Sequence, residues 1–534
     1  MNAKRRAASL LLAVVLAACA GTQATPGPNP PSTARTQDPD YGSPAPAPSP
    51  SRLPTPAVAP AEPAVFPVPT SASGDSIQMM AAPGGGLFVF VPGPGGPVMA
   101  LLGTDGRPAP GWPVRLVDAI RCSEPALVPD GSVRVLCAEE DRDAVVYALD
   151  ARGDTMPGWP IRLANGNCYS GLLTVGDGSV RIVCWRRSAS HAGAPSHIVF
   201  GLDAQGNTMP GWPVIPPPEA DTDEAYHEQR VVGDQLVLVA GDWFERDRGY
   251  EDWLVTFDKD GVVRSGVHVP AADARRVGLG PDGIAYLVEE VPNSSSATTA
   301  RITAFDLAGV RRGWPVSLDG QASTPAFRPD GRISVTAGTE KTSTVVVMDR
   351  AGKSISDVSP VLRIATARLG VDCGAGSPNL PIVARDGTTF VDSPDDPTIY
   401  ALDPSLDVRD GWPYTQPQGS PADECAGAEG ICCSFPLATP RSIGPDGTLY
   451  LALQPERSAV GGGITMIGRN GRVRPGWPVV LRRPGALFAS IVVGTDGTVH
   501  ALAIEPESGG RTSATVLGIA PDGSVRYRTA LADP

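Results

Sequence analysis

Cysteines are the residues of this chain with the clearest capacity for chemistry. Cys432 and Cys433 are adjacent, and such a pair either closes on itself as a vicinal disulfide or begins two separate disulfides. An acidic run at residues 219–224 could attract a cation, with a solvated loop as the alternative. The five histidines show no metal-ligand spacing, and the sequence has neither a Gly-x-Ser-x-Gly motif nor a phosphate-binding loop. The sequence therefore assigns no catalytic residue and no metal ligand.

Two further pairs of cysteines occupy matching places around neighbouring Asp-Gly turns. Cys122 and Cys137 flank one turn, and Cys168 and Cys184 flank the next. An even number of cysteines in an exported chain favours disulfides, so each pair is predicted to join the first and second strands of its own unit. The other four would close disulfides across two insertions, and a zinc site is the less favoured alternative. These four are Cys373, Cys425, Cys432 and Cys433.

The N-terminal residues have the pattern of a secretory leader. A basic stretch at residues 4–6 precedes an apolar run at residues 7–16, which is too short to span a membrane as a mature helix. The run ends in Leu-Ala-Ala-Cys, with the cysteine at Cys19. This ending resembles the lipobox of bacterial lipoproteins. The resemblance implies cleavage before Cys19, acylation of that residue, and anchoring to the cell envelope. Ala20 in place of Asp implies the outer membrane, if the cell has two membranes.

The composition then divides the mature chain in two. Residues 1–18 are predicted to be the signal peptide, and residues 19–73 a lipidated cysteine followed by a disordered tether rich in proline, alanine and serine. Residues 74–534 carry the apolar runs that can build a core. The net charge of −13 argues against nucleic acid and against an anionic lipid surface as partners of the folded part.

Residues 74–534 are organised by repeats. The tripeptide Gly-Trp-Pro occurs six times, and Asp-Gly dipeptides between alternating apolar runs separate the copies. Asp-Gly is a strong hairpin signal, because glycine takes the positive φ of the turn. Each unit of about 50 residues is predicted to be a four-stranded antiparallel meander. The proline places the fourth strand at a sheet edge, and the tryptophan is expected to pack between neighbouring sheets. The six tryptophans are Trp112, Trp159, Trp212, Trp314, Trp412 and Trp477.

Such a unit cannot bury both of its faces alone, so radial stacking into one all-β propeller is predicted. Nine units are counted, but three of them lack Gly-Trp-Pro. These are the fourth (Val267 at the tryptophan position), the sixth (near Ser354) and the ninth (Tyr527). Eight or nine blades are therefore predicted. Two smaller propellers are an alternative for which no internal linker is present.

The repeat pattern Leu-Asp-x-x-Gly followed by Gly-Trp-Pro resembles the repeats of bacterial PQQ-like (quinoprotein-like) propellers. It is also similar to those of integrin-type propellers, but it lacks their calcium-binding loops. Some quinoprotein dehydrogenases carry a vicinal disulfide, which Cys432 and Cys433 could match, but no accompanying set of Glu, Asn and Asp is found. No cofactor is expected, with PQQ and Ca²⁺ as the alternative.

These observations favour a non-catalytic binding or scaffold module for an envelope protein, a peptide or a glycan. The alternative is a PQQ-dependent oxidoreductase or a degenerate relative of one. A hydrolase or lyase in the central channel has no residue pattern to support it, since fold alone is no warrant. Loops on a rigid scaffold often carry function, so the insertions at 217–228 and 415–434 are the candidate partner sites.

Overall fold

The computed structural model describes residues 64–67, 77–91, 96–116, 121–123, 125–138, 144–163, 166–168, 172–186, 197–216, 228–241, 250–271, 275–292, 298–338, 343–354, 381–393, 396–415, 441–453, 461–508 and 511–532. These residues form nine β-sheets, here called blades 1 to 9 in chain order. A single turn of 3-10 helix, η2 (Pro83–Gly85), lies in blade 1. Within the described ranges, no helix has the length and apolar character needed to cross a membrane.

The first three blades contain the following strands. Blade 1 is β2 (Gln78–Ala81), β3 (Leu87–Val91), β4 (Val98–Leu102) and β5 (Val114–Arg115). Blade 2 is β6 (Arg121–Cys122), β7 (Ala126–Leu127), β8 (Val133–Ala138), β9 (Ala144–Leu149) and β10 (Ile161–Leu163). Blade 3 is β11 (Gly166–Asn167), β12 (Leu172–Thr174), β13 (Val180–Arg186) and β14 (His197–Leu202). Its outer edge continues through a bridge between Val199 and Val214.

The next three blades follow the same order. Blade 4 is β15 (Glu228–Val232), β16 (Gln235–Gly241), β17 (Tyr250–Phe257) and β18 (Val263–Ala271). Blade 5 is β19 (Arg275–Leu279), β20 (Ala285–Pro292), β21 (Thr298–Asp306), β22 (Gly309–Val310) and β23 (Val316–Asp319). Blade 6 is β24 (Gln321–Ala322), β25 (Ala326–Phe327), β26 (Ile333–Gly338) and β27 (Ser343–Met348).

The last three blades complete the ring. Blade 7 is β28 (Ile382–Val383), β29 (Thr389–Ser393), β30 (Asp396–Leu402) and β31 (Tyr414–Thr415). Blade 8 is β32 (Arg441–Ile443), β33 (Leu449–Leu453), β34 (Gly463–Ile467) and β35 (Val479–Val480). Blade 9 is β36 (Leu487–Val493), β37 (Val499–Pro506), β38 (Thr512–Ile519) and β39 (Val525–Ala532), with β1 (Ala64–Pro67) added at its edge.

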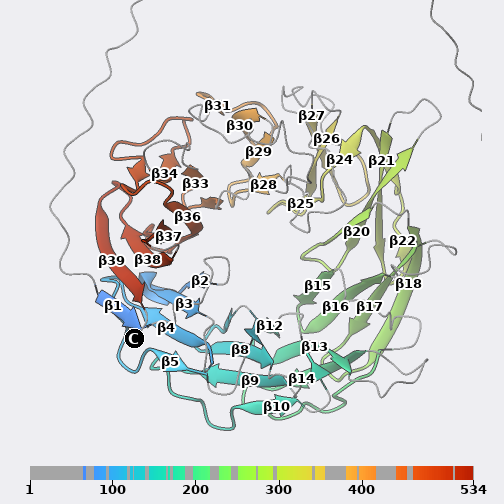
Figure 1. Ribbon diagram of the computed structural model, residues 1–534. Helices are drawn as coiled ribbons and strands as arrows, with labels where there is room; N and C mark the ends of the chain where they lie inside the picture. The colour runs from blue at the N-terminus through green and yellow to red at the C-terminus, as the bar shows by residue number, and fades with distance from the viewer. Residues whose placement is uncertain are drawn as a thin grey trace, which may run out of the picture. The chain divides into compact units, whose positions relative to one another are not determined.

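The blades stand side by side in a ring as a β-propeller (Figure 1). The first strands of neighbouring blades contact one another, as β2 does with β36 and β15 with β19, so these strands are the innermost of each blade. The short strands that follow Gly-Trp-Pro, such as β5, β10 and β35, are the outer edge strands. The predicted propeller is confirmed, and its blade number is nine.

The core consists of nine hydrophobic layers, one at each seam between neighbouring blades. β3 shows how one strand serves two layers, because all five of its residues are buried. Leu87, Val89 and Val91 pack at the seam with blade 9, whereas Phe88 and Phe90 pack at the seam with blade 2. Both faces of a blade are therefore apolar, because successive side chains of a strand point to opposite faces.

The two faces of the ring differ in their connections. The turn face is defined here as the face where the first strand joins the second and the third joins the fourth. Within the described residues these connections are turns with a recurring backbone hydrogen-bond pattern, and residues 355–380, which follow the third strand of blade 6, lie outside them. The loop face carries the second-to-third connections and the links between blades. Its second-to-third connections range from residues 394–395 in blade 7 to residues 187–196 in blade 3.

The ring closes between its two ends. β1 pairs with β39 in parallel, from Ala64 opposite Thr529 to Pro67 opposite Ala532. The hydroxyl of Thr529 also donates to the backbone oxygen of Gly106 in blade 1, at 2.6 Å. β1 lies inside the segment 19–73 that the sequence assigned to a disordered tether, so the ring begins earlier than residue 74. Because β1 is parallel to β39, the chain enters the ring at the turn face.

Candidate functional site

At six of the nine seams, the Gly-Trp-Pro segment of one blade contacts the turn between the third and fourth strands of the next blade. A Cβ added to the motif glycine would lie 1.8–2.4 Å from a carbonyl oxygen of that turn. The glycines also have φ of +80° to +93°, which favours glycine independently. The contacting pairs are Gly111 with Arg152, Gly158 with Gln205, Gly211 with Asp260, Gly313 with Ala351, Gly411 with Asn470 and Gly476 with Asp522.

The tryptophans of this motif are buried between blades, with 6–7% of their surface exposed. Five of them donate the indole N–H across the seam to a carbonyl oxygen of the same turn, at 3.0–3.2 Å. Among the described residues, the buried indole N–H of Trp159 has no hydrogen-bond partner. Its neighbour Gly158 also has the longest of the six glycine separations, 2.4 Å. The contact between Gly-Trp-Pro and the next turn is therefore slightly looser between blades 2 and 3 than in the other five pairs.

Each tryptophan stacks against a residue that stands four positions after the Asp of its own blade's Asp-Gly turn. In four blades this residue is aromatic: Phe88 follows a variant turn in blade 1, and Tyr286, Phe390 and Tyr450 follow Asp-Gly in blades 5, 7 and 8. In blades 2 and 3 it is Arg134 and Arg181, whose guanidinium carbons lie 5.2 Å from the ring centroids of Trp159 and Trp212. Sequence reasoning missed this position, although its fixed offset from Asp-Gly could have revealed it.

The three seams without Gly-Trp-Pro are built differently. Between blades 9 and 1, Tyr527 occupies the tryptophan position, and a Cβ on Gly106 would lie 2.2 Å from its ring. Between blades 6 and 7, Arg328 is 3% exposed and donates to Thr389 at 2.9 Å and to the backbone of Pro404 at 3.4 Å. Leu406 has a φ of +71° there, where other turns have glycine.

The seam between blades 4 and 5 leaves apolar side chains at the surface. Val262, Leu307 and Val310 are 53%, 38% and 48% exposed. A Cβ added to Gly309, which stands at the turn glycine position, would meet nothing within 4 Å. A missing Gly-Trp-Pro therefore leaves open space at this turn, whereas Tyr527 or Arg328 fills the other two seams.

The two predicted disulfides are confirmed. Cys122 bonds to Cys137, and Cys168 bonds to Cys184. Cys122 and Cys137 stand directly opposite each other on β6 and β8, so the bond joins the first and second strands of one blade. Both disulfides pack within the apolar layers between blades. Cys373, Cys425, Cys432 and Cys433 lie outside the described residues.

A cluster of ion pairs lies at the loop-face end of blade 5. The carboxylate of Glu289, 1% exposed, accepts two hydrogen bonds from Arg301 at 2.8 and 3.0 Å. Glu290 pairs with Arg276 at 3.4 Å and accepts from Gln321 of blade 6 at 3.4 Å. The hydrogen bonds that Arg301 donates to Glu289 raise the pKa of Arg301, whereas burial lowers the pKa of Arg276. These ion pairs hold the charged side chains at the loop-face end of blade 5 in defined positions.

One cation–π contact joins the first strand of blade 4 to the first strand of blade 6, with blade 5 between them. Arg230 of blade 4 reaches the ring of Phe327 in blade 6, with 5.8 Å between the guanidinium carbon and the ring centroid. Gly278 of blade 5 lies beside Phe327, and a Cβ there would come within 3.7 Å of its ring. On the same strand as Arg230, burial raises the pKa of Glu228, and the charge of Arg230 opposes this shift.

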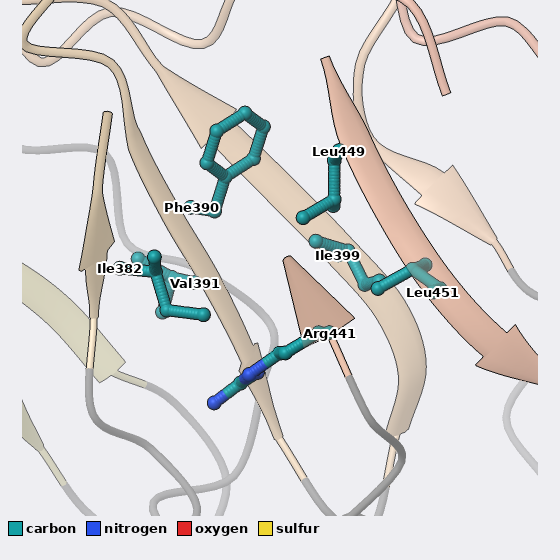
Figure 2. Close-up of a pocket in the computed structure, with 7 residues that line it drawn as sticks. All are labelled: Ile382, Phe390, Val391, Ile399, Arg441, Leu449 and Leu451. Atoms are coloured by element: carbon teal, nitrogen blue, oxygen red, sulfur yellow. The ribbon is translucent and has the colours of Figure 1, made fainter. Parts of the chain in front are cut away.

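A small cavity, with about 10 Å³ of space for the centre of a water molecule, lies in the seam between blades 7 and 8. Figure 2 shows Phe390 and Leu449 at one end of the cavity and Arg441 at the other. Its walls include the first residue of β28 and the first residue of β32. The cavity is therefore apolar, with one guanidinium at its edge.

The described ranges contain no group of three or more His, Cys, Asp or Glu side chains placed to hold a metal ion. Cys19 and the acidic run at 219–224 lie outside the described residues. The same is true of both candidate insertions, except for Glu228, which begins β15, and Thr415, which ends β31. The structure thus brings the six Gly-Trp-Pro tryptophans into the seams and gives no geometry for the lipidation site.

Comparisons with known proteins give distant structural likenesses. No protein-family model matches the chain, and no curated protein matches it in sequence. A crystal structure of the eukaryotic initiation factor is similar over 82% of this chain and 94% of that chain, with 10% identity and a TM-score of 0.48. Dihydro-heme d1 dehydrogenase NirN is similar over 79% and 76%, with 14% identity and a TM-score of 0.38.

A third likeness is to virginiamycin B lyase from Staphylococcus aureus. It covers 63% of this chain and 91% of that chain, at 14% identity and a TM-score of 0.31. The assignment of this chain to the β-propellers rests on its own nine blades.

Proposed function

We propose that this protein is a binding module of the cell envelope, a lipid-anchored propeller whose loop face holds another envelope protein, a peptide or a glycan. The observation that carries the proposal is the contrast between the two faces. The turn face consists of short repeated turns, which also form the contacts between blades. The second-to-third connections of the loop face vary from residues 394–395 in blade 7 to residues 187–196 in blade 3. Loops on a rigid scaffold can vary and bind without disturbing the packing beneath them.

The entry point of the chain supports the same orientation. β1 begins at the turn face, so a tether from Cys19 would reach the ring on that side. The loop face is then the face away from the point of attachment. The ion pairs of blade 5 add charged contact groups at this face.

In-cell photo-crosslinking from defined positions tests the proposal. A photoreactive residue is placed on the loop face at Arg482 or Glu507, and on the turn face at Arg152 or Lys259, all of them exposed positions. A defined partner captured from the loop face only is the expected result. Capture of the same partner from the turn face, or of none from any position, would contradict the proposal.

Two controls separate the parts of the proposal. Cys19→Ala should abolish metabolic labelling with an alkyne fatty acid and should release the protein from the membrane fraction. Capture that persists unchanged in this variant would show that binding is independent of anchoring. The competing prediction, a PQQ-dependent oxidoreductase, is tested by adding PQQ and Ca²⁺ and measuring dye-linked alcohol oxidation. Activity would favour the enzyme over the binding module.

A further inference from the structure

Blades 2 and 3 bury two arginines whose guanidinium groups lack enough acceptors. Arg134 and Arg181 are 0% and 1% exposed. Burial lowers the pKa of both groups, and a buried charge normally needs full hydrogen bonding. Among the described residues, Nε and Nη2 of Arg134 and Nε of Arg181 are buried without a hydrogen-bond partner. These two blades therefore contain unused donors inside the protein.

In each blade a methionine sulfur accepts a hydrogen bond from the same guanidinium. Nη1 of Arg134 lies 3.3 Å from Sδ of Met156, and Nη1 of Arg181 lies 3.2 Å from Sδ of Met209. A thioether is a weak acceptor. Both methionines are partly exposed to solvent. The same arrangement occurs twice, in neighbouring blades.

Blades 5, 7 and 8 arrange their arginine and aromatic residues differently. The residue two positions before the glycine of Gly-Trp-Pro is Met156 in blade 2 and Met209 in blade 3. In blades 5, 7 and 8 it is an arginine near the surface that pairs with an Asp. The aromatic residue then occupies the buried position on the second strand. Only blades 2 and 3 place a buried arginine beside a methionine, among the six that carry Gly-Trp-Pro. The arginines of blades 5, 7 and 8 are Arg311, Arg409 and Arg474.

We propose that Met156 and Met209 are sites of oxidation to methionine sulfoxide by peroxides, with the new oxygen bound by Arg134 and Arg181. A lone pair of the sulfur attacks one oxygen of hydrogen peroxide, an S–O bond forms, and the O–O bond breaks. The departing hydroxide takes the proton from the transferred oxygen, so the products are one sulfoxide and one water. The sulfur is oxidised by two electrons and the peroxide is reduced by two. The sulfoxide oxygen is a far stronger acceptor than the thioether, and it supplies the acceptor that the guanidinium lacks.

Hydrogen peroxide titration of the full mature chain, followed by peptide mass spectrometry, tests the first half of the proposal. Met79 and Met80 are also partly exposed, but they have no arginine partner among the described contacts, so they serve as internal controls. We expect Met156 and Met209 to be converted at lower peroxide doses than Met79 and Met80. Conversion at higher doses, or none, would overturn the proposal.

Thermal unfolding of the oxidised protein tests the second half. One new hydrogen bond at each site should raise the Tm by about 1–2 °C. In the double variant Met156→Leu/Met209→Leu, which conserves side-chain volume, peroxide should leave the Tm unchanged. In Met79→Leu/Met80→Leu, the rise should persist. An unchanged or lower Tm of the oxidised wild type would show that the arginines do not bind the sulfoxide oxygen.

Discussion

Nδ1 of His500 lies 2.6 Å from the hydroxyl oxygen of Tyr527, at the seam where blade 9 meets blade 1. Both residues are buried, and Tyr527 packs against Gly106 of blade 1. His500 holds the position that Phe390 and Tyr450 hold in blades 7 and 8. The seam that closes the ring therefore has a titratable pair where four other seams have an aromatic ring and a tryptophan.

This pair predicts a specific dependence of stability on pH. Burial lowers the pKa of His500 to about 4 from 6.5, with the charge of Arg526 acting in the same direction and that of Asp496 against it. The unfolded chain therefore binds a proton between pH 6.5 and pH 4 that the folded chain excludes. The free energy of unfolding should fall by about 3 kcal/mol as the pH drops through this window.

His500→Phe provides the control for this prediction, because the chain itself has Phe at the equivalent position in blade 7. The variant should lose this slope in urea unfolding curves recorded from pH 7 to pH 4. The carboxylates with lowered pKa, such as Asp496 and Asp446, contribute only at the acidic end of the range. Equal slopes in the two proteins would show that His500 does not cause this pH dependence of the free energy of unfolding.

A pair of glycines separates backbone strain from contact between blades. Gly111 and Gly131 have nearly the same φ, +87° and +84°. A Cβ on Gly131 would meet nothing within 4 Å, whereas on Gly111 it would lie 1.8 Å from the carbonyl oxygen of Arg152. Gly131→Ala should cost about 1–2 kcal/mol, and Gly111→Ala about 2–4 kcal/mol more. Similar losses in urea unfolding would mean that the seam relaxes around the methyl group.

A comparison of Trp112 with Trp159 gives the free energy that the indole hydrogen bond between blades contributes to stability. Trp112 donates its indole N–H to Ala151 at 3.1 Å, whereas the N–H of Trp159 has no partner among the described residues. Replacing either with Phe removes a similar volume, but only Trp112→Phe removes a hydrogen bond between blades. Trp112→Phe should therefore be less stable than Trp159→Phe by about 1 kcal/mol. Calorimetry measures the stability of both variants, and a less stable Trp159→Phe would show that the prediction is wrong.

The buried arginines predict an unusual substitution result. Among the described residues, Arg181 donates to Ser179, Val180 and Met209 and to no carboxylate, and its position beside the tryptophan is filled by Phe in blades 1 and 7. Replacing a poorly paired buried charge with an apolar residue is often neutral or stabilising. Arg181→Phe should therefore change the free energy of unfolding by between 0 and about +2 kcal/mol. Arg181→Ala, which leaves a cavity, should lower it by about 3 kcal/mol. Strong destabilisation by Phe would mean that the charge itself holds the seam.

Much of the fold follows from local sequence signals. Asp-Gly turns and alternating apolar runs predicted the meanders, and the matching places of Cys122 and Cys168 predicted the two disulfides. The contact between Gly111 and the turn at Arg152 was not predicted, because it joins different units. β1 was also missed, because its partner β39 lies at the other end of the chain and its four residues stand in a proline-rich segment.

The candidate site was less predictable than the fold for a physical reason. Ion pairs such as Glu289 with Arg301 depend on neighbours across strands, and no spacing in the sequence encodes them. The offset that places Arg134, Arg181 and His500 four residues after Asp is local, so it could have been found. The structural role of this offset cannot be assigned, however, until the tryptophan or the Tyr527 ring that these residues contact is known.

The contact between Gly-Trp-Pro and the neighbouring turn always points from one blade to the next along the chain. Each repeat with Gly-Trp-Pro thus carries the motif that contacts the next blade and a turn that can receive the motif of the preceding blade. A duplicated repeat would bring both the motif and the turn with it and would leave neither unmatched. Gene duplication could therefore change the number of blades in such a ring without requiring a new kind of contact between blades. Selection would then act mainly on the two ends that must meet, where Tyr527 and Gly106 stand.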